Sequence, residues 1–328
     1  MTTPRTGRAL VAATLPFARC IPSRSWWFTG STLFLLAGLL VASAVAPWAP
    51  LQLVFSVLAA LAAVRFFSIY HDYMHGGVLQ KSTLAKLVFS VFGLFILTPP
   101  SIWRFSHNSH HAHTGQAGGV YHGSFEILTT DMWRGLSTGR KVQHRLGRHP
   151  LTIGLGYFTV FMFGMCLFPF FKHPRKNVDA MVGLAFHYAV GAGVFAFFGP
   201  RTFLFAFFLP MLISSAMGAY LFYAQHNFEQ VVIHTGEDWT YELAALQSSS
   251  FITFSPLMHW FTGNIGYHHV HHLNARIPCY RLPEAMAAIP ELQTPRTTSF
   301  LPWDVARSFR LKLWDPQGRQ FVPYRDAA

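Results

Sequence analysis

Residues 71–75 read HDYMH, residues 107–111 read HNSHH, residues 268–272 read HHVHH, and a single His226 follows YLFYAQ at residues 220–225. On a helix, residues three or four apart share one face, so each of the three stretches presents its imidazoles together. Imidazole is the commonest protein ligand for transition metals, and nine ligands exceed the about six that one ion takes. The sequence therefore predicts two metal ions bound by His71, His75, His107, His110, His111, His226, His268, His271 and His272.

The type of ligand narrows the choice of metal. Only nitrogen donors recur at these stretches, with no cysteine or methionine box beside them, which argues against an iron–sulfur cluster or a blue copper site. The sequence has neither a CxxCH haem attachment motif nor the HExxH motif of zinc proteases. Two non-haem iron ions fit this ligand set best, and iron would be able to activate dioxygen. Two zinc ions are the alternative and would indicate hydrolysis.

The composition indicates a membrane protein. Of the 328 residues, 52% are hydrophobic and only 12% are charged, whereas a soluble domain has about a quarter of its residues charged. The mean hydropathy is +0.30. The formal charge of +12 comes from arginines and lysines beside apolar segments, a placement typical of cytoplasmic loops in contact with anionic lipid. We therefore expect membrane lipid, and not nucleic acid, as the partner of the basic residues.

Six apolar segments are candidates for membrane helices. They are residues 30–47, 51–70, 84–98, 152–171, 180–199 and 202–223. The histidines can share one site only if they lie on one side of the membrane, and the basic N-terminus places that side in the cytoplasm. An even number of membrane crossings must then separate one histidine stretch from the next. Residues 84–98 and 152–171 are therefore expected not to cross the membrane, and to be interfacial or re-entrant segments. The sequence predicts an all-α integral membrane fold with four transmembrane helices in two hairpins, two interfacial segments and a cytoplasmic helical cap.

The predicted organisation has three parts. Residues 1–28 form a basic N-terminal tail, and residues 29–223 form a membrane domain whose cytoplasmic loops hold the first two histidine stretches. Residues 224–328 form the cytoplasmic cap, which contains the third stretch and the proline-rich end of the chain. This arrangement predicts an integral membrane protein whose active site faces the cytoplasm.

Several other side chains are candidates for supporting roles. His113 and His269 lie inside the histidine stretches, where they could contact a metal or its ligands. Asp72, Glu229 and Asp238 could accept the free N–H of ligating imidazoles, or form surface ion pairs. Asn264 is a candidate helix N-cap, with a metal-bound water as its alternative partner. Arg65 lies within an apolar segment, where a charge has to pair or reach the interface, and Asp72 is its candidate partner.

At these stretches the chain resembles the membrane fatty acid desaturase family, and in particular bacterial acyl-lipid desaturases. HDYMHG at residues 71–76 and WRFSHNSHH at residues 103–111 are similar to the first two histidine boxes of that family. GNIGYHHVHHLN at residues 263–274 resembles the third box, and QHNFE at residues 225–229 supplies the single histidine. The likeness covers most of residues 55–320. It implies a mushroom-shaped helical fold, two irons and a narrow kinked tunnel for an acyl chain.

The chain departs from the family pattern at two places. The second box usually continues toward Thr-Asn, and here Thr114 is followed by Gly115. Some animal-type members have an asparagine one turn before the single histidine, acting through water, and here that position is Phe222. The nine histidines are therefore expected to be the complete ligand set, with one iron a ligand short.

The resemblance implies an oxygen-dependent di-iron desaturase that introduces a cis double bond into a fatty acyl chain. The chain shows no cytochrome-like or ferredoxin-like segment, so electrons are expected from a separate, acidic, ferredoxin-like donor. A di-iron hydroxylase or ketolase acting on a carotenoid, sterol or alkane is the alternative, because HDxMHG also occurs in carotenoid ketolases. A membrane zinc hydrolase also remains open. A metal transporter fits less well, since transporters hold their ligands near mid-membrane and these histidines follow the ends of apolar segments.

Overall fold

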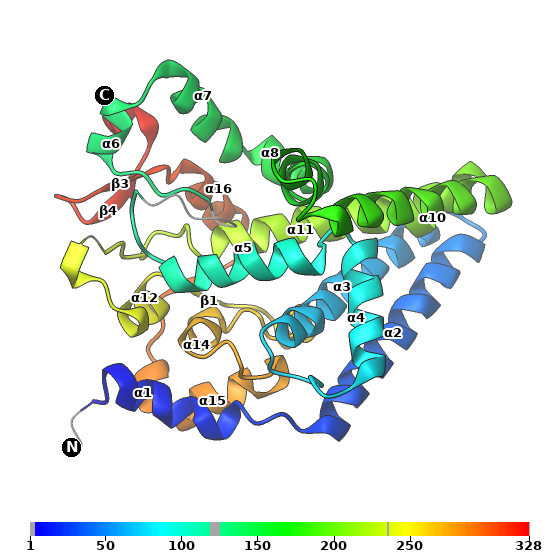
Figure 1. The fold of residues 1–328 in the computed structure, drawn as a ribbon, viewed down its shortest axis with the longest axis horizontal. Coiled ribbons are helices and arrows are strands. Elements are labelled where there is room, and N and C mark those ends of the chain that lie inside the picture. The colour runs from blue at the N-terminus through cyan, green and yellow to red at the C-terminus, as the bar shows by residue number, and fades with distance from the viewer. Residues whose placement is uncertain (1–3, 119–124, 235, 328) are drawn as a thin grey trace.

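Two helices with a proline in the first turn form a hairpin in the first quarter of the chain. The computed structural model describes residues 4–118, 125–234 and 236–327. In it, α2 (Pro22–Val45) and α3 (Ala49–Met74) run side by side (Figure 1). Pro22 and Pro50 occupy the first turns of these helices, where no backbone N–H is needed and the fixed φ of proline suits the helix. Both helices are long and apolar enough to cross a membrane.

A third apolar run, Val178–Ala224, is also long and apolar enough to span a membrane. The bent pair Thr83–Phe95 and Pro100–His113 is a fourth candidate among the described residues if it counts as one broken span. The run Val178–Ala224 consists of α10 (Val178–Phe203), the π-helical segment η3 (Leu204–Phe208) and α11 (Leu209–Ala224). The run is broken at Gly199, whose φ of 82° lies in the left-handed region that favours glycine. A Cβ added at Gly191 would lie 2.8 Å from the ring of Phe207, so the chain folds back at the break.

The turn at Gly199 is tied to the loop of the first hairpin. Arg201 donates from Nε to the Gln52 side-chain oxygen at 2.7 Å and from Nη2 to the Pro47 carbonyl at 3.0 Å. These bonds satisfy a cation that the sequence places beside an apolar segment. They also fix the free ends of the two hairpins to one another.

The two segments predicted to stay at the interface differ from the long helices. Residues 84–98 form most of α4 (Thr83–Phe95), and α5 (Pro100–His113) follows at an angle of 87°. Residues 152–171 lie in α8 (Pro150–Gly154), the π-helix η2 (Tyr157–Leu167) and α9 (Phe168–Lys172). The apolar helix Tyr157–Lys172 is shorter than the about 20 residues that a straight span requires.

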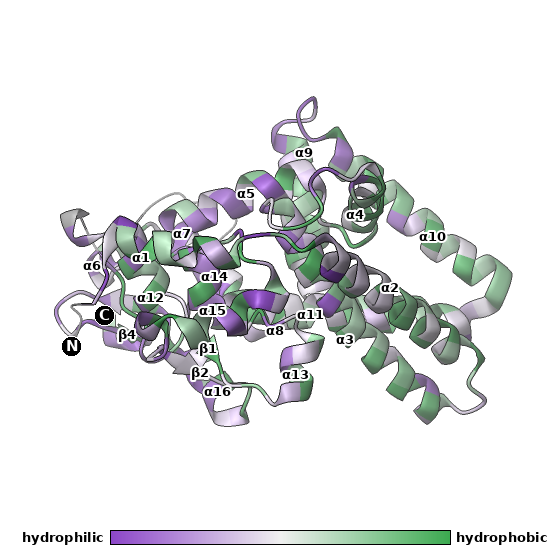
Figure 2. Ribbon diagram, turned by 90° about the horizontal axis from the view of Figure 1, so that it is seen from below, coloured by the Kyte–Doolittle hydropathy of each residue, from purple (hydrophilic) through white to green (hydrophobic). Residues whose placement is uncertain are grey.

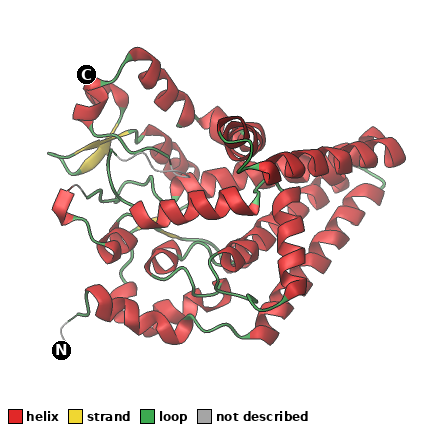
Figure 3. Cartoon of the chain, in the orientation of Figure 1, coloured by secondary structure: helices red, strands yellow, loops and turns green. Residues whose placement is uncertain are grey.

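Most of the other described residues form a cap of mixed polar and apolar character at one end of the apolar helices (Figure 2). Its helices are α6 (Thr130–Gly135), α7 (Thr138–Gly147), α12 (Tyr241–Gln247), α13 (Pro256–Phe261), α14 (His268–Leu273), α15 (Leu282–Ala288) and α16 (Pro302–Arg310). Strands are few and short in the described part (Figure 3): β1 (Phe251–Ile252) pairs in parallel with β2 (Thr297–Thr298), and β3 (Leu313–Asp315) pairs antiparallel with β4 (Gln320–Val322). The predicted all-helical character is therefore confirmed apart from these four strands.

The N-terminal segment packs onto this cap. Helix α1 (Gly7–Thr14) contacts α12, and Leu10 is buried in the same core cluster as residues of α14. Thr14 accepts a hydrogen bond from the Asn274 side chain at 2.8 Å, directly after the third histidine stretch. Arg5 forms an ion pair with Glu291 at 2.8 Å. The segment predicted as a basic tail thus covers one side of α14.

Candidate metal centre

Four separate parts of the chain bring the nine histidines together. Helix α3 continues past its apolar part to His71, with His75 at its end, and α5 carries the second stretch on one face. His226 follows the last turn of α11, and α14 carries the third stretch. In Figure 1, α3, α5, α11 and α14 meet where the apolar helices join the cap.

The nine side chains form two groups. The first histidine group contains His71, His75, His107, His111 and His271, and the second histidine group contains His110, His226, His268 and His272. Within each group, one ring nitrogen from every residue lies within 4.8 Å of the others. All nine predicted residues are therefore brought together, in two sets suited to one ion each. That they bind metal stays a prediction.

Several Nε2 atoms each lie close to more than one other Nε2 atom, an arrangement that hydrogen bonds alone cannot satisfy. In the first group His107 Nε2 lies 2.9 Å from that of His71 and 3.1 Å from that of His111, which is itself 3.1 Å from that of His271. A neutral imidazole nitrogen carries either one proton or one lone pair, so a nitrogen shared between two neighbours cannot bond well to both. The Nε2 atom of half-buried His75 is itself buried and has no hydrogen-bond partner. Converging lone pairs of this kind fit a metal ion.

The second histidine group repeats this arrangement. His226 Nε2 lies 3.0 Å from that of His110 and 2.9 Å from that of His268, and His268 Nε2 lies 3.0 Å from that of His272. His226 Nδ1 lies 2.9 Å from the Ser248 carbonyl oxygen, which can only accept. The proton of His226 is therefore on Nδ1, and the lone pair of Nε2 points into the group.

Two further contacts orient ligand rings from outside the groups. The Thr114 hydroxyl donates to the His110 carbonyl at 2.7 Å and lies 3.3 Å from His272 Nδ1, so it can accept the proton of that ring. Asp72 Oδ1 lies 3.6 Å from His71 Nδ1, while its other oxygen accepts the Cys279 backbone N–H at 2.6 Å. Of the three predicted carboxylates, Asp72 alone lies beside a ligand ring. Glu229 pairs with Arg307 at the surface, and Asp238 is exposed.

Burial keeps these imidazoles neutral. Loss of solvent lowers the pKa of His226 to about 4, and the hydrogen bond to Ser248 opposes this shift only in part. Burial also lowers the pKa of His268, His271 and His272 well below the ordinary value, and neighbouring imidazoles lower it further. At neutral pH the rings are uncharged ligands, as metal binding requires.

The two histidines that the sequence placed beside the metals lie outside both groups. His269 is fully buried, but its Nε2 lies 3.1 Å from the Leu292 carbonyl and outside the face of α14 that carries the ligand rings. His113 Nδ1 lies 2.8 Å from the Ser109 carbonyl, one turn earlier on α5. The helical period explains this result, because neither position shares the face of the ligand residues.

Two polar side chains have partners other than those predicted. Arg65 does not pair with Asp72. It donates to the Thr32 hydroxyl at 3.1 Å and to the Trp260 carbonyl, and its guanidinium stacks 4.8 Å from the Phe28 ring and 4.1 Å from the Trp260 ring.

Asn264 is neither the N-cap of α14 nor close to a metal position. Tyr267 precedes that helix, without a side-chain cap. Asn264 has a left-handed φ of 58°, and its side chain donates to the Cys279 carbonyl at 3.0 Å.

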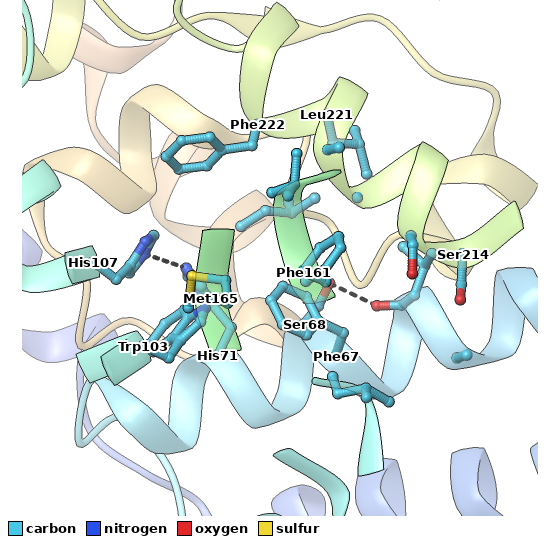
Figure 4. A pocket seen from close by; sticks show the side chains of 18 of the residues that line it. Phe67, Ser68, His71, Trp103, His107, Phe161, Met165, Ser214, Leu221 and Phe222 are labelled. Atoms are coloured by element: carbon cyan, nitrogen blue, oxygen red, sulfur yellow. Dashed lines mark hydrogen bonds between the residues drawn. The ribbon is translucent and has the colours of Figure 1, made fainter. Parts of the chain in front are cut away.

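An apolar cavity of about 320 Å³ adjoins both histidine groups. His71 and His107 of the first group and His268 of the second line it at one end, with Trp103 stacked 4.2 Å from the His107 ring. In Figure 4, Phe161 and Met165 of η2 lie between α3, with Phe67 and Ser68, and α11, with Ser214, Leu221 and Phe222. Apart from the histidines, the sequence did not indicate these lining residues, because they come from separate elements and share no motif.

The comparison with known proteins agrees with this geometry. The family model of fatty acid desaturases matches residues 46–301. A fatty acid desaturase of Bacillus subtilis is 32% identical over 276 residues, which cover 84% of this chain and 78% of the relative. The sn-1 oleoyl-lipid 12-desaturase of Anabaena variabilis is 22% identical over 76% of this chain and 71% of the relative. An sn-1 acyl-lipid omega-3 desaturase (ferredoxin) of Synechocystis is 25% identical, with 68% of this chain and 63% of the relative covered. This chain therefore belongs to the fatty acid desaturase family, whose members are oxidoreductases that use dioxygen.

Proposed function

We propose that this desaturase introduces a cis double bond into a fatty acyl chain at two non-haem iron ions, one in each histidine group. The observation that carries the proposal is the contact between the metal centre and the apolar cavity: rings of both groups form one end of a space that otherwise presents mostly apolar side chains. Bound iron would supply the activation of dioxygen that removal of hydrogen from an unactivated C–H bond requires. Nitrogen-only ligands suit iron, and zinc would lack this redox chemistry.

The side chains of the cavity hold and shield the acyl chain. Phe67, Phe161 and Met165 line the cavity, and they give a methylene chain an apolar environment that excludes water. Trp103 and Phe222 lie at the metal end, where the Phe222 ring is 4.7 Å from the His110 ring. These bulky rings limit which carbon atoms of the chain can approach the imidazoles, and this positioning selects desaturation at a fixed place.

The positions of the apolar helices favour four crossings of the membrane. Helices α2 and α3 form one hairpin, and the run Val178–Ala224 forms the second because it folds back at Gly199. Both hairpins then return to the end that carries the histidines. With basic loops on that side, the positive-inside rule places the cap in the cytoplasm, at the inner membrane of a bacterium.

A separate protein supplies the two electrons that each turnover needs. The Synechocystis relative carries ferredoxin in its name, and the formal charge of +12 on this chain suits an acidic donor of that kind. The relatives named for acyl-lipid substrates indicate that the acyl group of this substrate is carried by a lipid.

Expression in a bacterial host that makes only saturated chains, or chains with a known double bond, tests the proposal. Gas chromatography with mass spectrometry should reveal a new unsaturated acid and locate its double bond, and metal analysis of the purified protein should give two irons per chain. His110→Ala and His271→Ala, one from each group, should abolish the product while the protein still inserts. A hydroxylated or keto product would instead support the alternative oxygenase, and zinc without iron would refute both.

A further inference from the structure

A second cavity, much smaller than the apolar one, adjoins the second histidine group. Its volume is about 30 Å³, which leaves room for about two water-sized groups, because each needs about 10–15 Å³. His110, His226 and Arg148 are among the residues that line this small pocket. Phe125 and Phe222 line both cavities and so form part of the wall between them. The small pocket is therefore a separate space beside the same ligands.

Arg148 brings a permanent positive charge to the small pocket. The residue is 2% exposed, and a guanidinium keeps its proton in proteins. Glu126 offers Arg148 only its backbone carbonyl, while its carboxylate pairs with Arg140. No other Asp or Glu among the described residues forms an ion pair with Arg148. Burying an unpaired charge is strongly unfavourable, so this site needs an anionic partner.

The guanidinium of Arg148 also has more donors than acceptors around it. Nη1 donates to the Glu126 carbonyl at 3.0 Å, and Nη2 donates to the side-chain oxygen of Asn227. The buried Nε has no partner, and each Nη keeps a second N–H, because a guanidinium carries five in all. The rings of Tyr223 and Phe321 lie 5.3 and 5.9 Å from the guanidinium carbon. The two Nη atoms thus keep N–H groups for a ligand in the small pocket.

A second cation adds to the positive potential at Arg148. Lys312 donates from Nζ to the Arg148 carbonyl at 2.6 Å. Burial and the charge of Arg148 lower the pKa of Lys312 to about 8, and a cation nearby has this effect where no carboxylate balances it. A metal ion among the imidazoles of the second histidine group would add further positive charge, because neutral rings cancel none of it. The charges around the small pocket therefore favour an anion inside it.

We propose that the small pocket binds a small monovalent anion, of the size of formate or azide, held by the Arg148 guanidinium beside the second histidine group. Hydrogen bonds from arginine to an anion are about twice as strong as those between neutral groups. Water would fill the space but would leave the charge of Arg148 unbalanced. The second histidine group has four imidazoles where the first has five, so the anion lies beside the group with fewer ligands. This inference holds whichever reaction the metal centre performs.

Azide binding to the metal-free protein tests the site without relying on iron or turnover. The infrared stretching band of azide shifts when the anion leaves water and accepts hydrogen bonds from a protein. Titration of the purified full-length protein in detergent should reveal a displaced band that saturates, with a Kd on the order of 1 mM or tighter. A spectrum that shows only the band of free azide at every concentration would overturn the inference, and the small pocket would then hold water.

Arg148→Met and Arg145→Met form a matched pair. Each removes one cation from the same stretch of chain, but Arg145 is exposed and does not line the small pocket. Arg148→Met should weaken azide binding about 100-fold or more, because the anion loses a charged partner and its hydrogen bonds. Arg145→Met should bind azide as the wild type does. Equal weakening in the two variants would show that azide responds only to the basic charge of the cap, and would overturn the inference.

A second pair of variants leaves Arg148 in place and serves if Arg148→Met fails to fold. Ile127 lines the small pocket and is half-buried. Ile127→Phe should fill the pocket and abolish the displaced band, whereas Ile127→Val shortens the side chain and should keep it. Saturable azide binding that persists in Ile127→Phe would place the anion elsewhere and overturn the inference. Absence of any unsaturated product from the iron-loaded wild type, with azide binding as expected, would instead refute the proposed function alone.

Discussion

The Nε2 atoms of His111 and His271 lie 3.1 Å apart, although 160 residues separate them in the chain. His111 is on α5 and His271 on α14, so this contact joins the helix after the bent apolar segment to the cap. Both rings are buried. This contact between the second and third histidine stretches therefore holds α5 against the cap at the predicted metal site.

The third histidine stretch offers a matched pair of substitutions. His271→Ala removes one ligand of the first histidine group, whereas His269→Ala removes an equally buried ring that faces the Leu292 carbonyl. We expect His271→Ala to lose about half of the bound iron and all activity. His269→Ala should keep both irons, with a loss of stability of about 1–3 kcal/mol from the unpaired carbonyl. The number of iron ions per chain, measured by mass spectrometry, distinguishes the two variants. A full complement of iron in His271→Ala would show that His271 is not a ligand.

The cavity should respond to a side chain added at Gly218. This residue on α11 faces Phe161 across the cavity, and a Cβ there would lie 3.6 Å from the Phe161 ring. Gly218→Leu should exclude long acyl chains, with about 10–200-fold lower kcat/KM for each methylene displaced. Shorter chains should be affected less. Product analysis over a series of chain lengths measures the shift, and Gly38→Leu on the exposed face of α2 serves as control. A uniform loss for all lengths would contradict the placement of the acyl chain.

The spacing of the histidines predicted which rings share a helix face, because spacing on a helix is a local property. The period of the α-helix places His107, His110 and His111 on one face whatever the helix packs against. The resemblance to the three histidine boxes of the family then predicted that these separate stretches meet at one site. The break at Gly199-Pro200 was likewise readable, since both residues interrupt a helix by their own backbone chemistry.

The remaining features depend on partners far apart in the chain. Ser248 orients His226 through its backbone carbonyl, which every residue type possesses, so no sequence signal marks it. Arg65 and Asp72 lie on one helix and looked like a pair, but packing gives Arg65 the ring of Trp260 and gives Asp72 the N–H of Cys279. The π-helical form of η2 also had no sequence signal, because an uncharged apolar segment fits any helix type.

Arg65 should stabilise the junction between the membrane helices and the cap. It joins α3 to Thr32 on α2 and to Trp260 on α13. Arg65→Met keeps much of the volume but leaves the Thr32 hydroxyl and the Trp260 carbonyl without this donor, so we expect a loss of about 2–3 kcal/mol. Thermal unfolding in detergent measures the change. Lys86→Met, at an exposed position on α4, should change stability little, and equal effects in the two variants would contradict the anchoring role.

The metal-free protein should lose stability in acid. The folded-state pKa of His226 is depressed to about 4, so between the ordinary value near 6.5 and pH 4 the unfolded chain binds a proton that the folded chain does not. Stability is therefore fully present above about pH 6.5 and falls as the pH drops toward 4, by on the order of 3 kcal/mol for this residue. Denaturant unfolding at a series of pH values tests this. His226→Gln, which cannot be protonated, should be less acid-sensitive than the wild type.

Ring contacts lead from His110 toward the side of the cap that carries α7. The Phe222 ring lies 4.7 Å from that of His110, Phe125 lies 6.1 Å from Phe222, and Tyr223 lies 5.0 Å from Phe125. The Arg148 guanidinium, just after α7, lies 5.3 Å from the Tyr223 ring. A donor that docks at α7 would therefore be joined to the second histidine group by closely packed side chains.

Charge reversal on α7 tests whether an acidic electron donor docks there. Lys141 and Arg145 lie over the ring of Trp133, at 5.6 and 5.3 Å, on the basic outer side of the cap. Lys141→Glu with Arg145→Glu should raise the KM for a ferredoxin-like donor about tenfold or more at low salt, because opposed charges steer association. The kcat at saturating donor should change little. Arg8→Glu, an equally exposed reversal on α1 at the opposite edge of the cap in Figure 1, is the control. If Arg8→Glu raises the KM as much, or if added salt does not weaken the wild-type interaction, the donor does not bind through α7.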